Sequence, residues 1–359
     1  MKKILLIIEN LGSGGAERQI CGLAVMLTKL GYPCRLLTYC DNQFYEQYLR
    51  KNNVDYERQT NLSNKFTRVF RLATYVRRYK PDVVISYLAS VNVSMCLASL
   101  LCDTKLIVSE RNNNISLSFK DKIRFFLYRR SDRIVPNSNS QANFISQNFP
   151  NLKPKVLPII NFVDTVRFKP SLTLHDHEPF RIVTVARYTQ QKNVLRFLDV
   201  VKKAKVAKLN VRFDWYGDKE SYSKYYATVI QKYNTLDIAD YLSLHDSSDN
   251  IEVIYKESDA LCLPSLYEGY PNVVVEAMSC GLPVICANRF ENPYIVEDKI
   301  NGYLFDPENV DDIFSAIVWL LNLTEEEKMR MRVMNRKISL VRNSKDAFIQ
   351  SYVRLIESL

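Results

Sequence analysis

The sequence predicts an α/β protein made of two domains, each built on a doubly wound parallel sheet. The chain has 359 residues, which favours two domains of about 150 to 200 residues each. Short apolar segments alternate with amphipathic helices, and the alternation starts again near residue 181. A hydrophobic content of 47% and a charged content of 25% are typical of a soluble globular protein with a full core.

Each element of this alternation follows from a local pattern. In the first half, strands are expected at 3–9, 33–39, 83–86, 106–109 and 134–136, and helices at 16–30, 65–80, 91–101 and 118–130. In the second half, strands are expected at 181–185, 241–244, 260–263 and 284–286, with another ending at 214–217. Helices are expected there at 193–204, 222–233, 272–279, 311–321, 325–340 and 345–359. Gly281 and Pro283 stop the helix at 272–279.

Composition excludes several classes of protein. No apolar run reaches the roughly 18 to 20 residues of a transmembrane helix, and the apolar part of MKKILLIIENLG is too short for a signal peptide. The eight cysteines form no C-x-x-C pair, and no Asp-x-Asp pair occurs. His175 and His177 are interpreted as surface residues of a loop. A reduced, cytosolic protein without a structural metal is expected.

The positive charge is concentrated in the first half. Residues 1–165 hold 24 Lys and Arg against 12 Asp and Glu, or 24 − 12 = +12, and the remainder 25 − 27 = −2, which sum to +10. Such asymmetry suggests a polyanion, a membrane surface or a phosphorylated ligand. The basic helices at 65–80 and 119–133 suit an anionic leaflet, but for each helix alone the preferred interpretation is that its apolar face packs on the sheet while its charges meet water. For the domain as a whole, the charge favours peripheral membrane contact.

Two carboxylates in the stretch LPSLYEGYPNVVVEAMSCGLPVIC indicate a ligand site. Glu268 falls in a strand-to-helix turn, at the edge of an open α/β sheet where ligands bind. Glu276 lies in the following helix among apolar residues, where an ionised acid needs partners such as ligand hydroxyls or a cation. The alternative is that Glu268 is a capping acid and Glu276 is a solvated helix residue. Two acids at this spacing, inside strand-turn-helix-Gly-Pro-strand, favour function.

Three other turns carry polar side chains that suit a ligand. Arg187 and Lys192 bracket the turn before the helix at 193–204, where two cations beside a helix N-terminus suit a diphosphate. The turn GSGGAER offers Gly12 and Gly14 of a dinucleotide fingerprint, but Glu17 replaces its third glycine. With Asp41 to hold a ribose, the hypothesis of an oxidoreductase remains open. The alternative that these glycines only form a tight turn, without a ligand, also remains open.

The third turn is SERNNN at 109–114, which directly follows a strand. Its acid, base and amides are poor core material and indicate a site.

These segments together resemble one enzyme family from Gly14 to Leu359. The surround PS..EG.P.V..EAM..G.PVI is similar to the Glu-x7-Glu signature of retaining nucleotide-sugar glycosyltransferases of family 4. GGAER and SERNNN resemble loops of the polysaccharide-assembling branch of that family, which builds O-antigen and capsule. Arg187 and Lys192 match its GR...K pattern, with Ala186 where Gly is usual. The sequence departs from the family at Arg111, often His, and at Tyr294, usually an acid.

The resemblance implies a GT-B fold, in which two Rossmann-like domains face each other across a cleft. Residues 1–162 would bind the acceptor and residues 163–340 the nucleotide sugar, and a helix at 341–359 would cross back to the first domain. Arg187 and Lys192 would stabilise the departing diphosphate, Glu268 would hold the donor sugar and Glu276 the ribose. The other implied residues are Gly14, Gly15, Gly269, Tyr270, Pro271 and Asn272 on the donor side, and Glu110, Arg111 and Asn112 on the acceptor side. His245 stands near the nucleotide base where the family usually has Gly, and a donor-side ring that stacks on the base and an ordinary loop residue are equally open interpretations.

The implied activity is retaining transfer of a sugar from a nucleotide-diphosphate donor, a UDP-sugar by family habit, to a lipid-linked saccharide. The resemblance implies no cofactor and no metal. Expected partners are the nucleotide sugar, the lipid-linked acceptor and an anionic membrane surface, without nucleic acid. The protein would lie on the inner face of the cytoplasmic membrane. Alternatives are a Rossmann oxidoreductase using Gly12, Gly14 and Asp41, and a non-catalytic basic module that binds membrane or nucleic acid.

Overall fold

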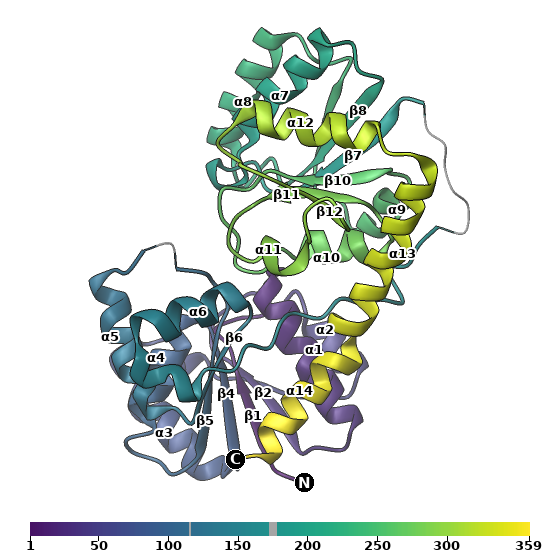
Figure 1. Cartoon of the computed structure of the whole chain (residues 1–359). Helices are drawn as coiled ribbons and strands as arrows, with labels where there is room; N and C mark the ends of the chain where they lie inside the picture. Colours follow the sequence, from purple (N-terminus) through teal and green to yellow (C-terminus); the bar gives the residue numbers. More distant parts are fainter. Residues whose placement is uncertain (115, 172–177) are drawn as a thin grey trace. The chain divides into compact units, whose positions relative to one another are not determined.

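The computed structural model describes residues 1–114, 116–171 and 178–359, so His175 and His177 lie outside the described residues. Two compact units make up the chain (Figure 1). Unit 1 holds Met1–Phe162 together with Asp346–Leu359, and unit 2 holds Val163–Lys345. Each unit contains its own six-stranded sheet.

Unit 1 is a parallel sheet in the order β3-β2-β1-β4-β5-β6. Its strands are β1 (Ile4–Ile7), β2 (Cys34–Thr38), β3 (Asp55–Arg58), β4 (Val83–Tyr87), β5 (Lys105–Glu110) and β6 (Arg133–Pro136). Side chains of β1 alternate between two cores, with Ile4 and Leu6 on one face and Leu5 and Ile7 on the other. Both faces are therefore covered, as a parallel sheet requires.

Helices cover the two faces of this sheet (Figure 1). The helices are α1 (Gly15–Lys29), α2 (Glu46–Lys51), α3 (Arg68–Tyr79), α4 (Ala89–Ala98), α5 (Phe119–Leu127), α6 (Asn139–Asn148) and α14 (Lys345–Glu357), with 3-10 turns η1 (Thr60–Leu62), η2 (Tyr128–Arg130) and η3 (Pro150–Lys155). The last helix belongs to the core of unit 1, because Phe348, Tyr352 and Ile356 are buried in the same cluster as Ile4 and Leu6.

Unit 2 repeats the arrangement in the order β12-β11-β10-β7-β8-β9, again with parallel pairs. Its strands are β7 (Phe180–Val185), β8 (Val211–Tyr216), β9 (Leu242–His245), β10 (Ala260–Leu263), β11 (Val284–Ala287) and β12 (Gly302–Phe305). Its helices are α7 (Val194–Val206), α8 (Ser223–Leu236), α9 (Ile251–Lys256), α10 (Asn272–Ser279), α11 (Asn292–Ile295), α12 (Val310–Leu321) and α13 (Glu325–Arg342), with the 3-10 turn η4 (Gln190–Lys192).

The prediction of two doubly wound parallel sheets is confirmed. The bounds predicted for α10 agree with the structure, and Gly281 ends this helix with a φ of +82° that favours glycine. Six helices and strands were not predicted, namely α2, β3, α6, α9, α11 and β12. No helix in the described ranges is both long and apolar enough to span a bilayer.

Candidate functional site

The loops that carry most of the predicted donor residues share one edge of unit 2. Because all six strands of this sheet are parallel, the segments that follow β7, β8, β9 and β10 all leave its carboxyl edge. Arg187 and Lys192 follow β7, His245 ends β9, and Glu268 follows β10. Ligands of open α/β sheets bind at this edge, near the point where the strand order reverses, here between β7 and β10.

A buried ion pair lies at this reversal. The Lys192 ammonium donates to the Glu268 carboxylate, with Nζ to Oε1 at 2.5 Å. Only 11% and 10% of the two side chains are exposed. Residues 76 positions apart in sequence are thus brought together, and both were predicted as site residues.

Asn193 fixes the loops around this pair, although it was not predicted as a site residue. Its backbone is left-handed, with φ 62° and ψ 30°, a conformation that Asn tolerates better than most residues. Its side-chain amide donates to the carbonyl oxygens of Pro264 at 3.1 Å and Pro307 at 2.7 Å. One side chain therefore ties together the loops after β7, β10 and β12. Its position directly before a helix was the only available signal.

Arg187 contacts a different loop. Its guanidinium donates to the hydroxyl of Tyr222 at 3.0 Å and lies 5.7 Å from the centre of that ring. Tyr222 follows the end of β8, and the Arg187 side chain is exposed. The structure thus places a second cation at the same edge, attached to the neighbouring loop.

Glu276 is 4% exposed in the second turn of α10, so the alternative of a solvated helix residue is wrong. Tyr270 and Pro271, just before α10, are also buried, whereas Gly269 and Asn272 are half-buried. The Tyr270 hydroxyl accepts a hydrogen bond from Asn343 at 2.5 Å, and burial raises the pKa of that hydroxyl. The tyrosine side chain therefore packs within unit 2.

His245 already stacks on another ring. Its imidazole lies 4.3 Å from the ring of Tyr216 at an interplanar angle of 11°, and its Nε2 lies 2.7 Å from Oδ1 of Asp214. The side chain is 37% exposed. The Asp214 contact and the Tyr216 stack fix the orientation of the ring, and one of its faces is taken by Tyr216.

In unit 1, an acid occupies the helix end expected to meet the donor diphosphate. Gly14 is the N-cap of α1, and a Cβ built on Gly14 would lie 2.3 Å from Oε2 of Glu17. Burial, and secondarily the charge of Glu9, raise the pKa of Glu17. A carboxylate at a helix N-terminus satisfies the helix dipole and repels a phosphate. The donor role of Gly14 and Gly15 stays a prediction.

The expectation that SERNNN is poor core material is wrong for its first three residues. Ser109, Glu110 and Arg111 are 0%, 2% and 6% exposed. Glu110 accepts a hydrogen bond from the Tyr128 hydroxyl and forms an ion pair with Arg124 at 3.4 Å. Buried charges are tolerated when they are paired and hydrogen-bonded, and here they are.

Arg111 is held by three groups inside unit 1. Its terminal nitrogens donate to Asn161 and to the Tyr352 hydroxyl, each at 3.0 Å, and its guanidinium lies 3.9 Å from the centre of the Tyr87 ring. Arg111 therefore connects β5 to α14. Of the three predicted acceptor-side residues, Asn112 alone is exposed.

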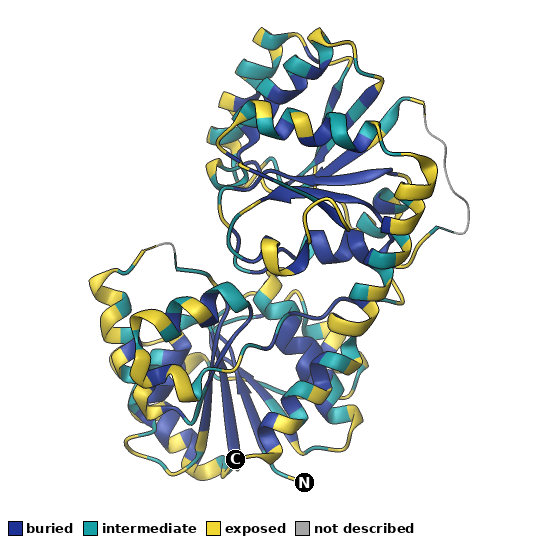
Figure 2. Ribbon diagram, viewed as in Figure 1, coloured by how far each residue is buried: buried dark blue, intermediate teal, exposed yellow. Residues whose placement is uncertain are grey.

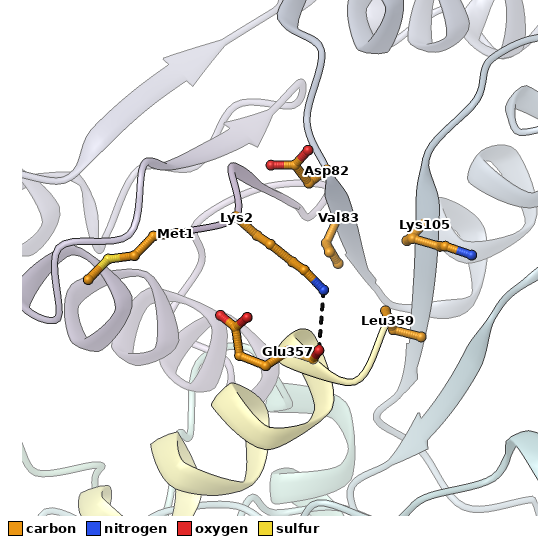
Figure 3. Close-up of a pocket in the computed structure, with 7 residues that line it drawn as sticks. All are labelled: Met1, Lys2, Asp82, Val83, Lys105, Glu357 and Leu359. Atoms are coloured by element: carbon orange, nitrogen blue, oxygen red, sulfur yellow. Dashed lines mark hydrogen bonds between the residues drawn. The ribbon is translucent and has the colours of Figure 1, made fainter.

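Two further features of the structure bear on ligand binding. Among residues 1–114, 116–171 and 178–359, no group of three or more His, Cys, Asp or Glu side chains is placed to hold a metal ion. A hollow of about 390 Å³ lies at the amino edge of the unit 1 sheet, opposite the loops after its strands (Figure 3). Lys2 crosses this hollow and donates to the Ile356 carbonyl at 2.9 Å. None of the predicted site residues lines it.

Two parallel six-stranded sheets with alternating helices define the GT-B fold. The family model "Glycosyltransferase Family 4" matches residues 13–167, and the model "Glycosyl transferases group 1" matches residues 167–338. The two matches together span residues 13–338, and the chain belongs to the glycosyltransferases. This assignment favours sugar transfer over the oxidoreductase alternative.

Similar proteins agree with this assignment. The amylovoran biosynthesis glycosyltransferase AmsD of Erwinia amylovora is 27% identical over 340 residues, covering 92% of each chain. A Campylobacter jejuni α-1,4-N-acetyl-D-galactosaminyltransferase, whose name gives a diphosphoundecaprenol-linked acceptor, is 26% identical over 348 residues, covering 93% of this chain and 92% of its own. The structure of Anabaena HepE in complex with UDP and glucose superposes with a TM-score of 0.87 at 18% identity, covering 100% of both chains.

Proposed function

We propose that this chain is a retaining, metal-independent glycosyltransferase of bacterial surface polysaccharide assembly. It moves a sugar from a UDP-sugar to a lipid-linked saccharide at the inner face of the cytoplasmic membrane. The buried Lys192–Glu268 pair at the carboxyl edge of unit 2 carries the proposal.

Lys192 suits the role of stabilising the leaving diphosphate. Its hydrogen bond to Glu268 uses one of three ammonium donors, and the others can meet phosphate oxygens. The pair is little exposed, and a fixed cation stabilises developing negative charge more strongly where water is excluded. Arg187, on the same loop, supplies the second cation, so the two together do what a Mg²⁺ ion does in other enzymes.

Two carboxylates suit the hydroxyls of the donor. Glu268 is oriented by Lys192 and accepts hydrogen bonds from the transferred sugar, and Glu276 accepts them from the ribose. Both follow β10, one in the loop and one in α10, so they lie on the same βα unit. Stacking of the base on the free face of the His245 ring completes the proposed donor site.

The nucleotide and the acceptor rest on other support. The HepE complex contains UDP, and the Campylobacter relative is named for an undecaprenol-linked acceptor. The charge of +12 over residues 1–165 suits an anionic membrane and a diphosphate-linked lipid. The resemblance to family 4 supports retention of configuration.

The first test is thermal unfolding of the protein with EDTA and UDP, GDP, ADP, NAD or UDP-sugars. A nucleotide at a hundred times its Kd adds about 2.7 kcal/mol to the free energy of unfolding. We expect UDP or a UDP-sugar to raise the melting temperature without metal. Stabilisation by NAD alone, or by UDP only when Mg²⁺ is added, contradicts the proposal.

The Lys192→Ala variant is expected to lower kcat by about 10² to 10³-fold, because the variant loses a cation that acts on the leaving group. Lys232→Ala is the matched control, since it removes another lysine–carboxylate pair of unit 2, to Asp199 at 2.7 Å, between α7 and α8. Radiolabelled sugar transfer to a diphosphoundecaprenol-linked saccharide measures both. Equal activity of the two variants would exclude Lys192 from catalysis.

A further inference from the structure

We propose that the outer face of α5 lies in the headgroup region of an anionic lipid bilayer and anchors unit 1 there. The inference deepens the proposed function, because a lipid-linked acceptor requires the enzyme to work at a membrane surface. It rests on three side chains, Phe119, Ile123 and Phe126, which are 76%, 47% and 62% exposed. We call them the α5 stripe.

The α5 stripe follows one side of the helix. Its members are spaced by four and three residues, which places them on a single face about 10 Å long. The core-facing side is separate, because Phe125 is fully buried and its ring packs at 5.5 Å from Tyr128 and 4.7 Å from Phe149. The interpretation that the apolar residues of this helix only pack on the sheet is therefore wrong. Figure 2 shows α5 as a largely exposed helix of unit 1.

The charges around the α5 stripe have one sign. Lys120 and Lys122 on α5 and Arg129 and Arg130 on η2 are exposed, and no ion pair within the described part of the chain involves them. The guanidinium of Arg129 lies 5.4 Å from the centre of the Phe126 ring, so this cation borders the stripe directly. Exposed aromatic rings flanked by cations are the pattern of helices that lie in a membrane interface.

Asp121 is the sole acid of residues 116–131, and its carboxylate is engaged by neighbouring groups of the same segment. It forms a capping box with Ser118 and an ion pair with Arg124 at 2.8 Å, and its side chain is 16% exposed. Burial alone would raise the pKa of Asp121, but the Ser118 hydrogen bonds and the charge of Arg124 lower it. The negative charge is neutralised, and the cap fixes the start of α5 before any lipid is met.

Charge decides between the possible occupants of this face. A second copy of the same chain would bring four cations against four cations, which is unfavourable. An anionic leaflet supplies the opposite charge to the lysines and arginines and apolar depth to the rings. A lipid surface is thus the occupant that suits both features.

The test is co-sedimentation of the full chain with vesicles of phosphatidylcholine, with or without phosphatidylglycerol, at low and high salt. We expect binding to the anionic vesicles alone and its loss at high salt. The variant Phe119→Ser/Phe126→Ser should bind these vesicles at least about tenfold more weakly than the unmodified protein. The control is Phe44→Ser, because Phe44 is also 62% exposed but precedes α2, between Asp41 and Glu46.

The charge is tested separately. Lys120→Ser/Lys122→Ser should weaken vesicle binding about tenfold or more, whereas Lys51→Ser/Lys224→Ser changes the net charge equally and should leave binding almost unchanged. Equal effects of the two pairs, or no difference between the phenylalanine variants, would overturn the inference. Self-association that depends on the α5 stripe, without vesicle binding, would also overturn it. The UDP-induced thermal shift, read on the same samples, reports the proposed function independently.

Discussion

Glu110 shows how a single charged residue can be structural although it follows a strand at a sheet edge. Its carboxylate is 2% exposed and meets Tyr128, Asn92 and Arg124. Arg111, the next residue, is likewise buried and donates hydrogen bonds to Asn161 and Tyr352. Both side chains are therefore expected to act on the stability of unit 1 rather than on the acceptor.

Glu110→Ala should lower the free energy of unfolding by about 3–5 kcal/mol, because removal of one buried partner leaves polar groups unpaired. Glu110→Gln keeps the shape and should retain transferase activity. Glu326→Ala is the control, since Glu326 is 85% exposed and its pair with Arg330 contributes about 0.5 kcal/mol or less. Urea unfolding measures all three, and a stable but inactive Glu110→Gln would indicate an acceptor-binding role instead.

Predictions for single residues depend on the local sequence, which carries no information about distant partners. Lys192, Glu268 and Glu276 stand out because charged groups in an apolar strand-turn-helix pattern are locally anomalous. SERNNN stands out for the same reason, yet the partners of Glu110 lie on α4, α5 and η2. Those of Arg111 lie in the segment after η3 and on α14, up to 241 positions away. Asn193 was missed because its contacts, to Pro264 and Pro307, are invisible in its own segment.

At the scale of elements, the carboxyl edge of unit 2 depends on a close approach between β7 and β8. Gly217 follows β8, and a Cβ built on it would lie 2.2 Å from the carbonyl oxygen of Ala186. Trp215 donates to the same oxygen at 2.8 Å. The end of β8 is therefore held directly against the start of the loop that carries Arg187 and Lys192.

Gly217→Ala should lower the free energy of unfolding by about 1–3 kcal/mol, because the obstacle is backbone and cannot rotate away. It should also weaken UDP binding, since the loop with both cations is displaced. Gly12→Ala is the comparison, because its nearest atoms, at 3.0 and 3.1 Å, belong to the side chains of Asn42 and Asn10 and can move. Calorimetry of unfolding and of UDP binding measures both, and equal behaviour would contradict the prediction.

Element prediction failed where the local pattern was weak. β3 reads DYER, without apolar alternation, and its burial pattern contains no fully buried residue. It is held as an edge strand by β2, with Arg35 bonded to Asp55 and Glu57, which only the folded sheet brings together. β12 is four residues long between two turns, and its place at the sheet edge is fixed by pairing with β11.

At the scale of the molecule, unit 1 is completed by a segment from the other end of the chain. Phe348, Tyr352 and Ile356 of α14 share a core with Ile4 and Leu6. The Tyr352 hydroxyl also bonds Tyr87 at 2.8 Å. Unit 1 is therefore expected to be unstable without α14, whereas unit 2 does not depend on it.

Removal of residues 346–359 should abolish hydrogen-exchange protection of β1 and α1, because it uncovers apolar core, and should leave β10 and α10 protected. Tyr352→Phe keeps the packing and should lower the free energy of unfolding by only about 1–2 kcal/mol through the lost hydrogen bonds. Exchange measured by mass spectrometry resolves the two units. Equal loss of protection in both units would show that they unfold as one.

The place of α14 in unit 1 also sets the order in which the two units of the nascent chain can fold. When Phe162 leaves the ribosome, the apolar core that contains β1 and α1 still lacks its last helix. About 180 residues of unit 2 must be translated first, which takes about 10 to 40 s at about 5–20 residues per second. Residues 1–162 of unit 1 are thus translated before unit 2, but unit 1 completes its core only after unit 2 has been translated. During that interval it exposes an apolar surface that a ribosome-associated chaperone would recognise.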